Sequence, residues 1–264
     1  GMSTRLEPIL ESTRRRVEAL HPHAADVRAR AADADTPRGF AAALRRHPDG
    51  PLRVIAELKR RSPSAGAIRE DLDPVDAARQ LEKAGAAALS VLTEPEFFGG
   101  SLDFLGEVRA AVDLPLLRKD FVLDPLQIAE ARAAGADAVL LLAVALDDDL
   151  LRRCADEAAR WDLDVLAEAH DDEELDRLLA LQLPVVGVNA RDLTSFEVDL
   201  PGALERCARI PSDRIVVAES GVRDRSAADR VAATAVDAVL CGEGLMRPGT
   251  PADRFATLFG VRTS

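Results

Sequence analysis

The feature that most constrains the fold of this chain is an alternation of apolar and amphipathic segments that begins near residue 53. Eight apolar segments of strand length occur near 53–58, 87–92, 115–118, 138–142, 163–168, 184–189, 214–219 and 236–241. Eight helical patterns follow them, near 74–84, 101–112, 124–134, 147–160, 171–180, 201–208, 223–232 and 251–259. Eight such units that close on themselves form a (β/α)8 or TIM barrel, so the sequence predicts an α/β protein of this class.

A doubly wound open sheet is the alternative fold. It usually carries a glycine-rich G-x-G-x-x-G turn after its first strand, and residues 59–66 lack that spacing. A chain of 264 residues can bury one large core, although two smaller domains are also possible. We therefore predict an N-terminal helical extension over residues 1–50 and a (β/α)8 barrel catalytic domain over residues 51–264.

The predicted extension contains an amphipathic helix and a second, short helix. The apolar stripe of the first helix consists of Leu6, Leu10, Val17 and Leu20, and the second helix follows Pro37. A barrel covers its own strands with eight helices, so an additional apolar stripe is expected to cover one of its ends. The stripe leaves open whether the extension is a plug at the bottom of the barrel or a lid over its mouth.

Composition narrows the classes of partner. The chain has 34 basic and 46 acidic residues, a formal net charge of −12, which argues against nucleic acid but permits a local cationic pocket for a small anion. It has no apolar run near 18 residues and no signal peptide, so we expect a cytoplasmic protein without a membrane anchor. Apolar residues make up 47% of the chain and aromatic residues 3%, which predicts an aliphatic core.

Cysteine and histidine give no indication of a metal site. Cys154, Cys207 and Cys241 lack the spacing of metal ligands and are expected to be buried free thiols in a reducing compartment. The four histidines are scattered. We therefore expect no bound metal, and a monomer or a weak homo-oligomer.

Polar residues concentrate where the apolar strands end. The strand ends carry Glu57 and Lys59, Thr93 and Glu94, Lys119 and Asp120, Glu168 and His170, Asn189 and Arg191, Glu219 and Ser220, and Gly242 and Glu243. Active sites of (β/α)8 barrels lie at this end of the strands, and charges there are costly unless they have a function. Two lysines, several glutamates and an asparagine on one rim can supply a general acid, a general base and an anion clamp.

Each residue of the rim also has a structural interpretation. Glu57 and Lys59 are two apart in a strand and face the same way, so they could form an ion pair that caps the barrel. Lys119 could be a surface lysine whose aliphatic stem packs on the barrel, and Glu168 a solvated strand end. Their joint occurrence on one rim is what favours an active site.

Two glycine-containing turns predict a phosphate site. Ser220–Gly221 follows the seventh strand, and Gly242–Glu243–Gly244 follows the eighth and is expected to open a short helix. Backbone amides and helix N-termini bind anions, and barrels of this type often bind phosphate at these strands. The alternative is that the glycines only make tight turns. The polar loop around Ser62 could add hydroxyl groups.

The loop phenylalanines Phe97, Phe98 and Phe121 have two interpretations. Such residues usually fold back onto the core. Because they stand beside Glu94 and Lys119 in the sequence, they could instead form an apolar wall for a ring-bearing substrate.

These residues lie in segments that closely resemble the indole-3-glycerol phosphate synthase family, over nearly the whole chain. The segments are Ile55–Ser64, Val91–Glu94 with Phe97–Ser101, Leu117–Phe121, Gly187–Leu193, Ala218–Val222 and Gly242–Arg247. The helical extension also resembles that family's. Small departures occur at Ala167, Ala169, Ala190 and Gly244, and they leave the catalytic set intact.

The resemblance implies a reaction and the residues that carry it. The substrate would be 1-(2-carboxyphenylamino)-1-deoxyribulose 5-phosphate, which closes a ring, loses CO2 and water and gives indole-3-glycerol phosphate in tryptophan biosynthesis, with no cofactor and no metal. Lys119 would be the general acid at the substrate carbonyl, and Glu168 the carboxylate that stabilises the cationic intermediate or takes a proton. Glu57 and Asn189 would orient hydroxyl groups. Lys59 would contact the substrate carboxylate or phosphate and act as a second acid.

The resemblance also implies the groups that bind the substrate. Ser62, Gly221, Gly242 and Glu243 would bind the phosphate, the last three through their backbone. Phe98, Phe121, Leu140 and Leu193 would wall the aryl ring. Arg191, Glu219 and the catalytic Ser220 would complete the site.

Two other functions remain alternatives. A phosphoribosylanthranilate isomerase-like barrel would favour a Cys/Asp acid–base pair, and no cysteine stands at the end of the first strand. A non-catalytic barrel that acts as a binding protein would be expected to have lost the charged rim, which this chain retains.

Overall fold

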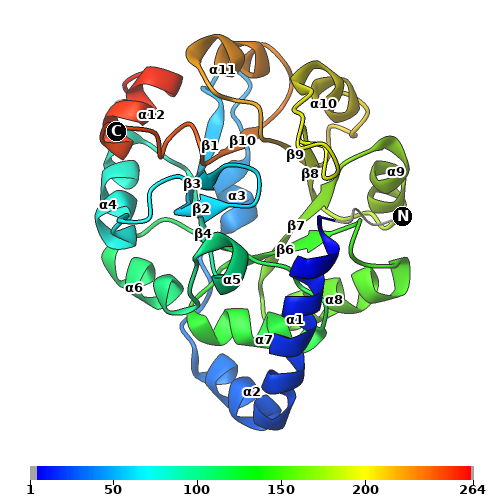
Figure 1. The fold of residues 1–264 in the computed structure, drawn as a ribbon. Coiled ribbons are helices and arrows are strands. Elements are labelled where there is room, and N and C mark those ends of the chain that lie inside the picture. Colours follow the sequence, from blue (N-terminus) through cyan, green and yellow to red (C-terminus); the bar gives the residue numbers. More distant parts are fainter. Residues whose placement is uncertain (1–4, 263–264) are drawn as a thin grey trace.

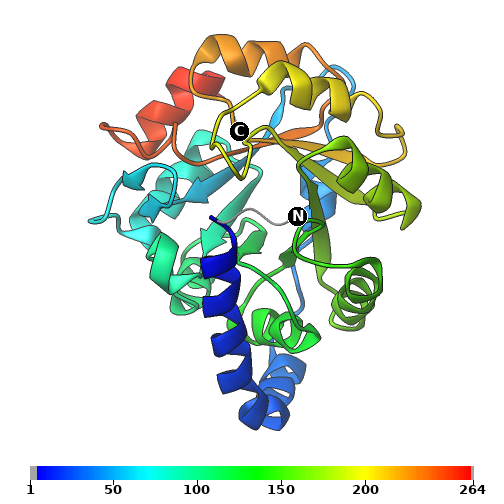
Figure 2. The same ribbon diagram turned by 45° about the vertical axis from the view of Figure 1, so that its right-hand side comes forward.

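Eight parallel strands form a closed barrel, in which β1 pairs with both β4 and the last strand, β10. The computed structural model describes residues 5–262, and Figures 1 and 2 show the ring of strands inside a layer of helices. The barrel strands are β1 (Arg53–Leu58), β4 (Ala88–Leu92), β5 (Leu116–Lys119), β6 (Ala138–Leu142), β7 (Asp164–Ala169), β8 (Val185–Asn189), β9 (Ile215–Glu219) and β10 (Ala238–Cys241). The predicted (β/α)8 barrel is confirmed.

The outer helices follow the strands in the predicted order. They are α4 (Pro74–Ala84), α6 (Asp103–Ala111), α7 (Pro125–Ala134), α8 (Asp148–Arg160), α9 (Asp172–Ala180), α10 (Leu200–Cys207), α11 (Arg225–Ala232) and α12 (Pro251–Phe259). Most begin after an aspartate whose side chain accepts a hydrogen bond from an amide of the first turn: Asp73, Asp124, Asp147, Asp171, Asp199 and Asp224. Among residues 5–262, no helix combines the length and apolar character that crossing a membrane requires.

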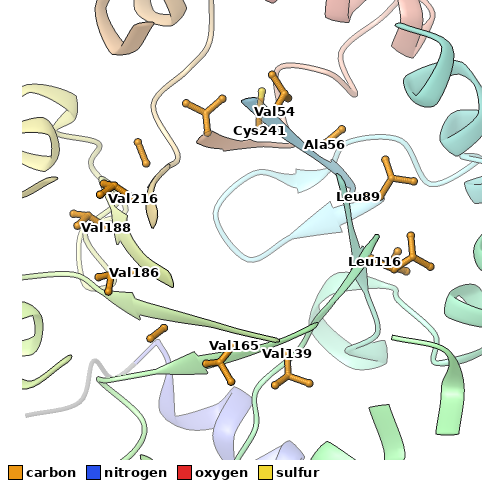
Figure 3. Close-up of a cluster of buried hydrophobic side chains, with 14 of the residues drawn as sticks. Val54, Ala56, Leu89, Leu116, Val139, Val165, Val186, Val188, Val216 and Cys241 are labelled. Atoms are coloured by element: carbon orange, nitrogen blue, oxygen red, sulfur yellow. The ribbon is translucent and has the colours of Figure 1, made fainter. Parts of the chain in front are cut away.

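Alternation along the strands divides the core into two layers. Side chains such as Val54, Ala56 and Leu116 point outward and pack against the helices (Figure 3). Their neighbours, such as Ile55 and Leu117, point inward and fill the barrel. Both layers are mainly aliphatic, as the composition predicts. The three cysteines are buried and free, as expected.

A short helix of the extension, α3 (Phe40–Leu44), closes the bottom of the barrel. Phe40 and Leu44 are fully buried against the inward-facing residues of the strands. Aspartates at the amino ends of the strands also hold the segment, because Asp164 accepts a hydrogen bond from the backbone amide of Ala41 at 2.8 Å. Asp137 likewise accepts one from the amide of Arg38 at 2.7 Å.

The remainder of the extension lies on the outside of the barrel and reaches its mouth. Helix α2 (Ala24–Asp33) packs against α7, and α1 (Glu7–Leu20) runs from there towards the mouth (Figures 1 and 2). Arg16 of α1 donates to both carboxylate oxygens of Asp120, at 2.8 and 3.1 Å. The extension therefore provides both a plug at the bottom and a segment at the mouth, whereas the sequence presented these as alternatives.

Some local structure differs from the sequence-based expectation or was not foreseen. Residues 243–245 after β10 form a turn in which the carbonyl of Gly242 accepts the hydrogen bond, so the prediction of a short helix there is wrong. The separate helix α2, the helix α5 (Pro95–Phe98) and the two-stranded hairpin of β2 (Arg61–Ser62) and β3 (Gly66–Ala67) were not predicted. Each is too short or too polar to show a clear period.

Candidate active site

Three charged side chains form a cluster at the mouth of the barrel, where the inward rows of β1 and β5 end. The carboxylate of Glu57 is fully buried. Lys119 Nζ lies 2.8 Å from its Oε2, and Lys59 Nζ lies 3.0 Å from its Oε1. The hydroxyl of Ser90 on β4 also donates to Oε2, at 2.8 Å. One carboxylate therefore positions two ammonium groups side by side.

Glu57 and Lys119 keep each other charged. Burial by itself raises the pKa of Glu57, but Lys119 and Lys59 reverse this effect and lower it to about 2. Burial lowers the pKa of Lys119, but the attractions of Glu57, Glu219 and Glu168 together outweigh burial and raise it above its ordinary value. At neutral pH, Lys119 is therefore an ammonium with protons to donate.

A second cluster lies at the end of β7. Glu168 is 3% exposed, and its Oε2 lies 3.0 Å from Nε2 of His170. Burial raises the pKa of Glu168, but the charge of His170 lowers it to about 2. Burial lowers the pKa of His170, and Glu168 and then Glu174 raise it to about 10. Glu168 is therefore a carboxylate beside an imidazolium.

Glu219, at the end of β9, has a different environment. It is buried, and burial and the neighbouring charge of Glu168 raise its pKa well above 4.5. The backbone of Gly187 on β8 leaves the space that its carboxyl group occupies, because a Cβ at position 187 would lie 2.5 Å from Glu219 Oε2. The pKa values of Glu168 and Glu219 are therefore shifted in opposite directions.

Polar groups from β8 and the loops beside it complete the rim. The side-chain oxygen of Asn189 accepts hydrogen bonds from the hydroxyl of Ser220 and the backbone amide of Arg191, both at 2.9 Å. Ser220 has a φ of 67°, a left-handed conformation that is uncommon for a residue with a side chain. Such strain persists only where the surrounding structure holds it in place, and it is often found at functional sites.

The rim surrounds a cavity of about 150 Å³ with one apolar wall. The wall includes Phe98 and Phe121, whose ring centroids are 6.0 Å apart, and Leu140 on β6. Lys119 and Glu168 line the same cavity. A planar aromatic group could therefore lie against the wall while its polar part faces the charged residues.

A smaller cavity of about 60 Å³ adjoins the first one. It is lined by the backbone segments that follow β9 and β10, including Gly221 and Gly242, and by Glu57. The residues that line both cavities are Lys59, Lys119, Asn189, Arg191 and Ser220. One extended ligand could therefore occupy both cavities, with an anionic end in the glycine-lined one.

Every residue to which the family resemblance assigns a role lines at least one of the two cavities, whereas Thr93, Glu94 and Phe97 line neither. The larger cavity takes Ser62, Phe98, Phe121, Leu140, Glu168 and Leu193, the smaller one takes Glu57, Glu219, Gly221, Gly242 and Glu243, and the remaining five line both. Asp120, which stands beside Lys119 on the rim, also lines the larger cavity, although its carboxylate binds Arg16, Thr93 and Arg118.

Several residues at the site were not predicted as members of it. His170 stands at a strand end, but its ion pair with Glu168 depends on the local backbone. Leu6, which directly precedes α1, Ile9 of α1 and Phe196 of the loop after β8 also line the larger cavity. Their sequence patterns fit ordinary packing equally well. Only the amphipathic stripe of α1 signalled that this helix covers something.

The fold and the site together define a (β/α)8-barrel enzyme of the kind that binds a small phosphorylated substrate at the carboxyl ends of its strands. Comparison with known proteins narrows the class. The chain belongs to the indole-3-glycerol phosphate synthase family, whose sequence model matches residues 6–258.

Individual relatives agree with this assignment. The proteins named indole-3-glycerol phosphate synthase from Koribacter versatilis and Rhodospirillum rubrum are 47% and 48% identical over 261 and 265 residues, and each match covers 98% of this chain and 100% of the relative. A chain of the tryptophan synthase complex of Pyrococcus furiosus superposes with a TM-score of 0.60 at 16% identity, covering 80% of this chain and 99% of its own. At that identity the likeness concerns the fold alone.

Proposed function

We propose that this protein closes the indole ring of 1-(2-carboxyphenylamino)-1-deoxyribulose 5-phosphate, with release of CO2 and water, to give indole-3-glycerol phosphate for tryptophan biosynthesis. The observation that carries the proposal is the pair of adjoining cavities with Lys119, Lys59 and Asn189 at their junction. The substrate has the matching order of groups: an aryl ring, a carbonyl with hydroxyls, and a phosphate.

Binding would follow from the chemistry of the two cavities. The aryl ring lies against Phe98, Phe121 and Leu140, and the phosphate accepts hydrogen bonds from backbone amides around Gly221 and Gly242. The middle of the substrate then meets the charged rim. Among the described residues, Ser62 Oγ accepts a hydrogen bond from the amide of Ala65 at 3.1 Å, so its hydroxyl also shapes the loop that borders the cavity.

Ring closure forms a bond between the aryl carbon that bears the carboxylate and the carbonyl carbon. Lys119 donates a proton to the carbonyl oxygen as negative charge develops on it. The ring then carries a positive charge delocalised to the nitrogen, which the carboxylate of Glu168 stabilises. Loss of CO2 leaves its electron pair in the ring and restores aromaticity.

Dehydration completes the reaction. The hydroxyl formed from the carbonyl leaves as water after it is protonated. In our proposal the acid is Lys59, the second ammonium group paired with Glu57. Loss of a proton from the neighbouring CH2 carbon then forms the double bond of the indole, and Glu168 is the base in our proposal. The atoms balance as one substrate giving one indole product, one CO2 and one water.

The setting of the enzyme is part of the proposal. We place it in the cytoplasm, because three buried free thiols suit a reducing compartment. We expect a monomer or a weak homo-oligomer, since Val261 is the large hydrophobic side chain that stands out as exposed among the described residues. Light scattering at micromolar concentration tests this oligomeric state, and a stable large oligomer would contradict the expectation.

A turnover assay tests the function directly. Incubation of the protein with 1-(2-carboxyphenylamino)-1-deoxyribulose 5-phosphate should produce indole fluorescence and one CO2 per product. A non-catalytic binding protein would produce neither. An isomerase-like barrel would convert an amino sugar phosphate without release of CO2, so measurement of CO2 separates the two enzyme classes.

A further inference from the structure

A buried imidazole is held by two carboxylates beside the cavity. His170 follows directly after β7, and its side chain is 8% exposed. Nε2 lies 3.0 Å from Glu168 Oε2, and Nδ1 lies 3.3 Å from Oε1 of Glu174 on α9. The backbone amide of His170 also donates to this oxygen of Glu174, at 3.1 Å. The negative charges of two carboxylates, one beside each ring nitrogen, favour the imidazolium form of this side chain.

The neighbouring carboxyl group of Glu219 has no such partner. Both of its oxygens are buried, and within residues 5–262 no N–H or hydroxyl group donates to either. Its Oε2 lies against Gly187, the residue that pairs directly with Glu168 in the register of the barrel, and burial together with the charge of Glu168 raises its pKa. Two buried carboxylates in contact repel each other strongly, so such a pair shares one proton. The question is which of the two carries it.

We propose that His170 is a positioning residue that fixes Glu168 as the ionised member of the pair and leaves the shared proton on Glu219. The imidazolium compensates negative charge on Glu168 at a distance of 3.0 Å. Glu219 gains no equivalent compensation and, as a neutral acid, can donate its proton to Glu168. This geometry gives two adjacent carboxyl groups opposite roles.

The other charged groups near the pair do not reverse this order. Lys119 on β5 attracts both carboxyls, and Glu57 on β1 disfavours a charge on Glu219. Around His170, Glu174 on α9 and Asp192 in the loop after β8 are acidic and favour the imidazolium. The pKa shifts agree with a proton on Glu219, since the pKa of Glu168 is lowered to about 2 and that of Glu219 is raised well above 4.5.

The assignment matters for catalysis in so far as the proposed function holds. An ionised Glu168 can stabilise a cationic ring and take a proton at any pH near neutrality. A protonated Glu219 can donate a hydrogen bond to a substrate oxygen, which a carboxylate cannot do. His170 borders the larger cavity, but in this scheme it acts through Glu168.

Infrared spectroscopy of the protein without substrate locates the proton. At neutral pH, the carbonyl stretch of a buried protonated carboxyl group should be present in the wild type and in Glu168→Gln and absent in Glu219→Gln. Loss of the band in Glu168→Gln with retention in Glu219→Gln would place the proton on Glu168 and overturn the proposal. This readout needs no turnover, so it fails independently of the proposed function.

Kinetics then test the positioning role of His170. The neutral side chain in His170→Gln can still donate to Glu168 but cannot compensate its charge. We expect the wild-type kcat to stay level from pH 7 to 5, and the kcat of His170→Gln to fall in this range, approaching about tenfold per pH unit once Glu168 is mostly protonated. His23→Gln, a change at an exposed histidine outside the site, is the matched control. A loss of kcat that is the same at every pH would indicate a merely structural role and contradict the proposal.

Discussion

Lys119 shows how a residue at the end of an inward-facing row acquires its chemistry from its neighbours. The chain has 34 basic residues, of which only Lys59, Lys83 and Lys119 are lysines. Two of the three contact Glu57. An arginine at either position would present a broad planar guanidinium, whereas the compact ammonium of lysine carries rotatable donors that can reach a developing alkoxide beside Glu57.

Replacement of Lys119 by Met should abolish most turnover. The variant keeps the aliphatic stem but loses the acid, and loss of a general acid typically lowers kcat by about 10²–10⁴-fold. Steady-state kinetics with circular dichroism provide the measurement. Lys83→Met, at an exposed position of α4, is the control and should behave as the wild type. If Lys119→Met retained more than about a third of kcat, Lys119 would not be the acid.

Gly187 has a less obvious role at the site, because it leaves room for a neighbouring carboxyl group. Because a Cβ there would lie 2.5 Å from Glu219 Oε2, Gly187→Ala should displace this carboxyl group. Misplacement of a catalytic group by about 1 Å can cost on the order of 10²-fold in rate, so we expect a loss in kcat of that order. Gly106→Ala, where the nearest heavy atom to the added Cβ is 3.9 Å away, is the matched control. Equal kinetics of the two variants would show that the space at Gly187 is not required.

Among the elements, α1 connects the outside of the barrel to its active site. Arg16 binds Asp120, the residue next to Lys119, and Leu6 and Ile9 line the cavity. Arg16→Ala should therefore loosen α1 and raise KM several-fold, because the wall of the cavity becomes less well defined. Arg14→Ala removes an exposed arginine of the same helix that pairs only locally, with Glu7 and Glu11. Unchanged kinetics in both variants would mean that the α1 contact does not shape the site.

Helix α3 contributes to the stability of the barrel in a different way. Phe40 is fully buried at the bottom, so Phe40→Ala should lower the free energy of unfolding by about 3–5 kcal/mol, the usual cost of such a cavity. Urea unfolding measures this, and Val261→Ala, at a side chain that is 88% exposed, is the control. A change below about 1 kcal/mol would show that the bottom of the barrel does not depend on the plug.

The same elements show what the sequence could and could not predict. The barrel followed from eight apolar segments of strand length, because a period of two places alternate side chains inside and outside. The rim followed from the polar residues that end these segments. The interactions of His170 with Glu168, of Arg16 with Asp120 and of Gly187 with Glu219 join residues from different elements or depend on a local bend, and no periodicity encodes them. Since α3 closes the bottom of the barrel with Phe40 and Leu44, removal of residues 1–45 should damage the core as well as the mouth.

For the whole molecule, the buried charges make stability depend on pH in two directions. The pKa of Glu57 in the folded protein is about 2, below its ordinary value of 4.5. Its contribution to stability is therefore present above pH 4.5 and is lost as the pH falls from 4.5 towards 2. Glu168, with a pKa of about 2, has the same sign. Acid should therefore destabilise the fold below about pH 4.5.

His170 and Glu219 have the opposite sign. Folding raises the pKa of His170 from 6.5 to about 10, so its contribution is complete below pH 6.5 and is lost as the pH rises towards 10. Folding also raises the pKa of Glu219 well above 4.5, so its contribution decreases from pH 4.5 upward. Near neutral pH the stability curve therefore contains these two effects, which have to be separated.

Comparison of the wild type with His170→Gln separates them, because Glu219 is present in both proteins. The difference between their free energies of unfolding, measured by urea titration from pH 6.5 to 9.5, should decrease with rising pH, by up to roughly 1.4 kcal/mol per pH unit. The decrease arises because only the wild type binds a proton at this site in the folded state that it has released in the unfolded state. The same comparison with His23→Gln, whose side chain is exposed, should give a difference that is independent of pH. If the difference for His170→Gln were also constant, the folded protein would hold His170 as a neutral imidazole, and the charge that keeps Glu168 ionised would have to come from Lys119.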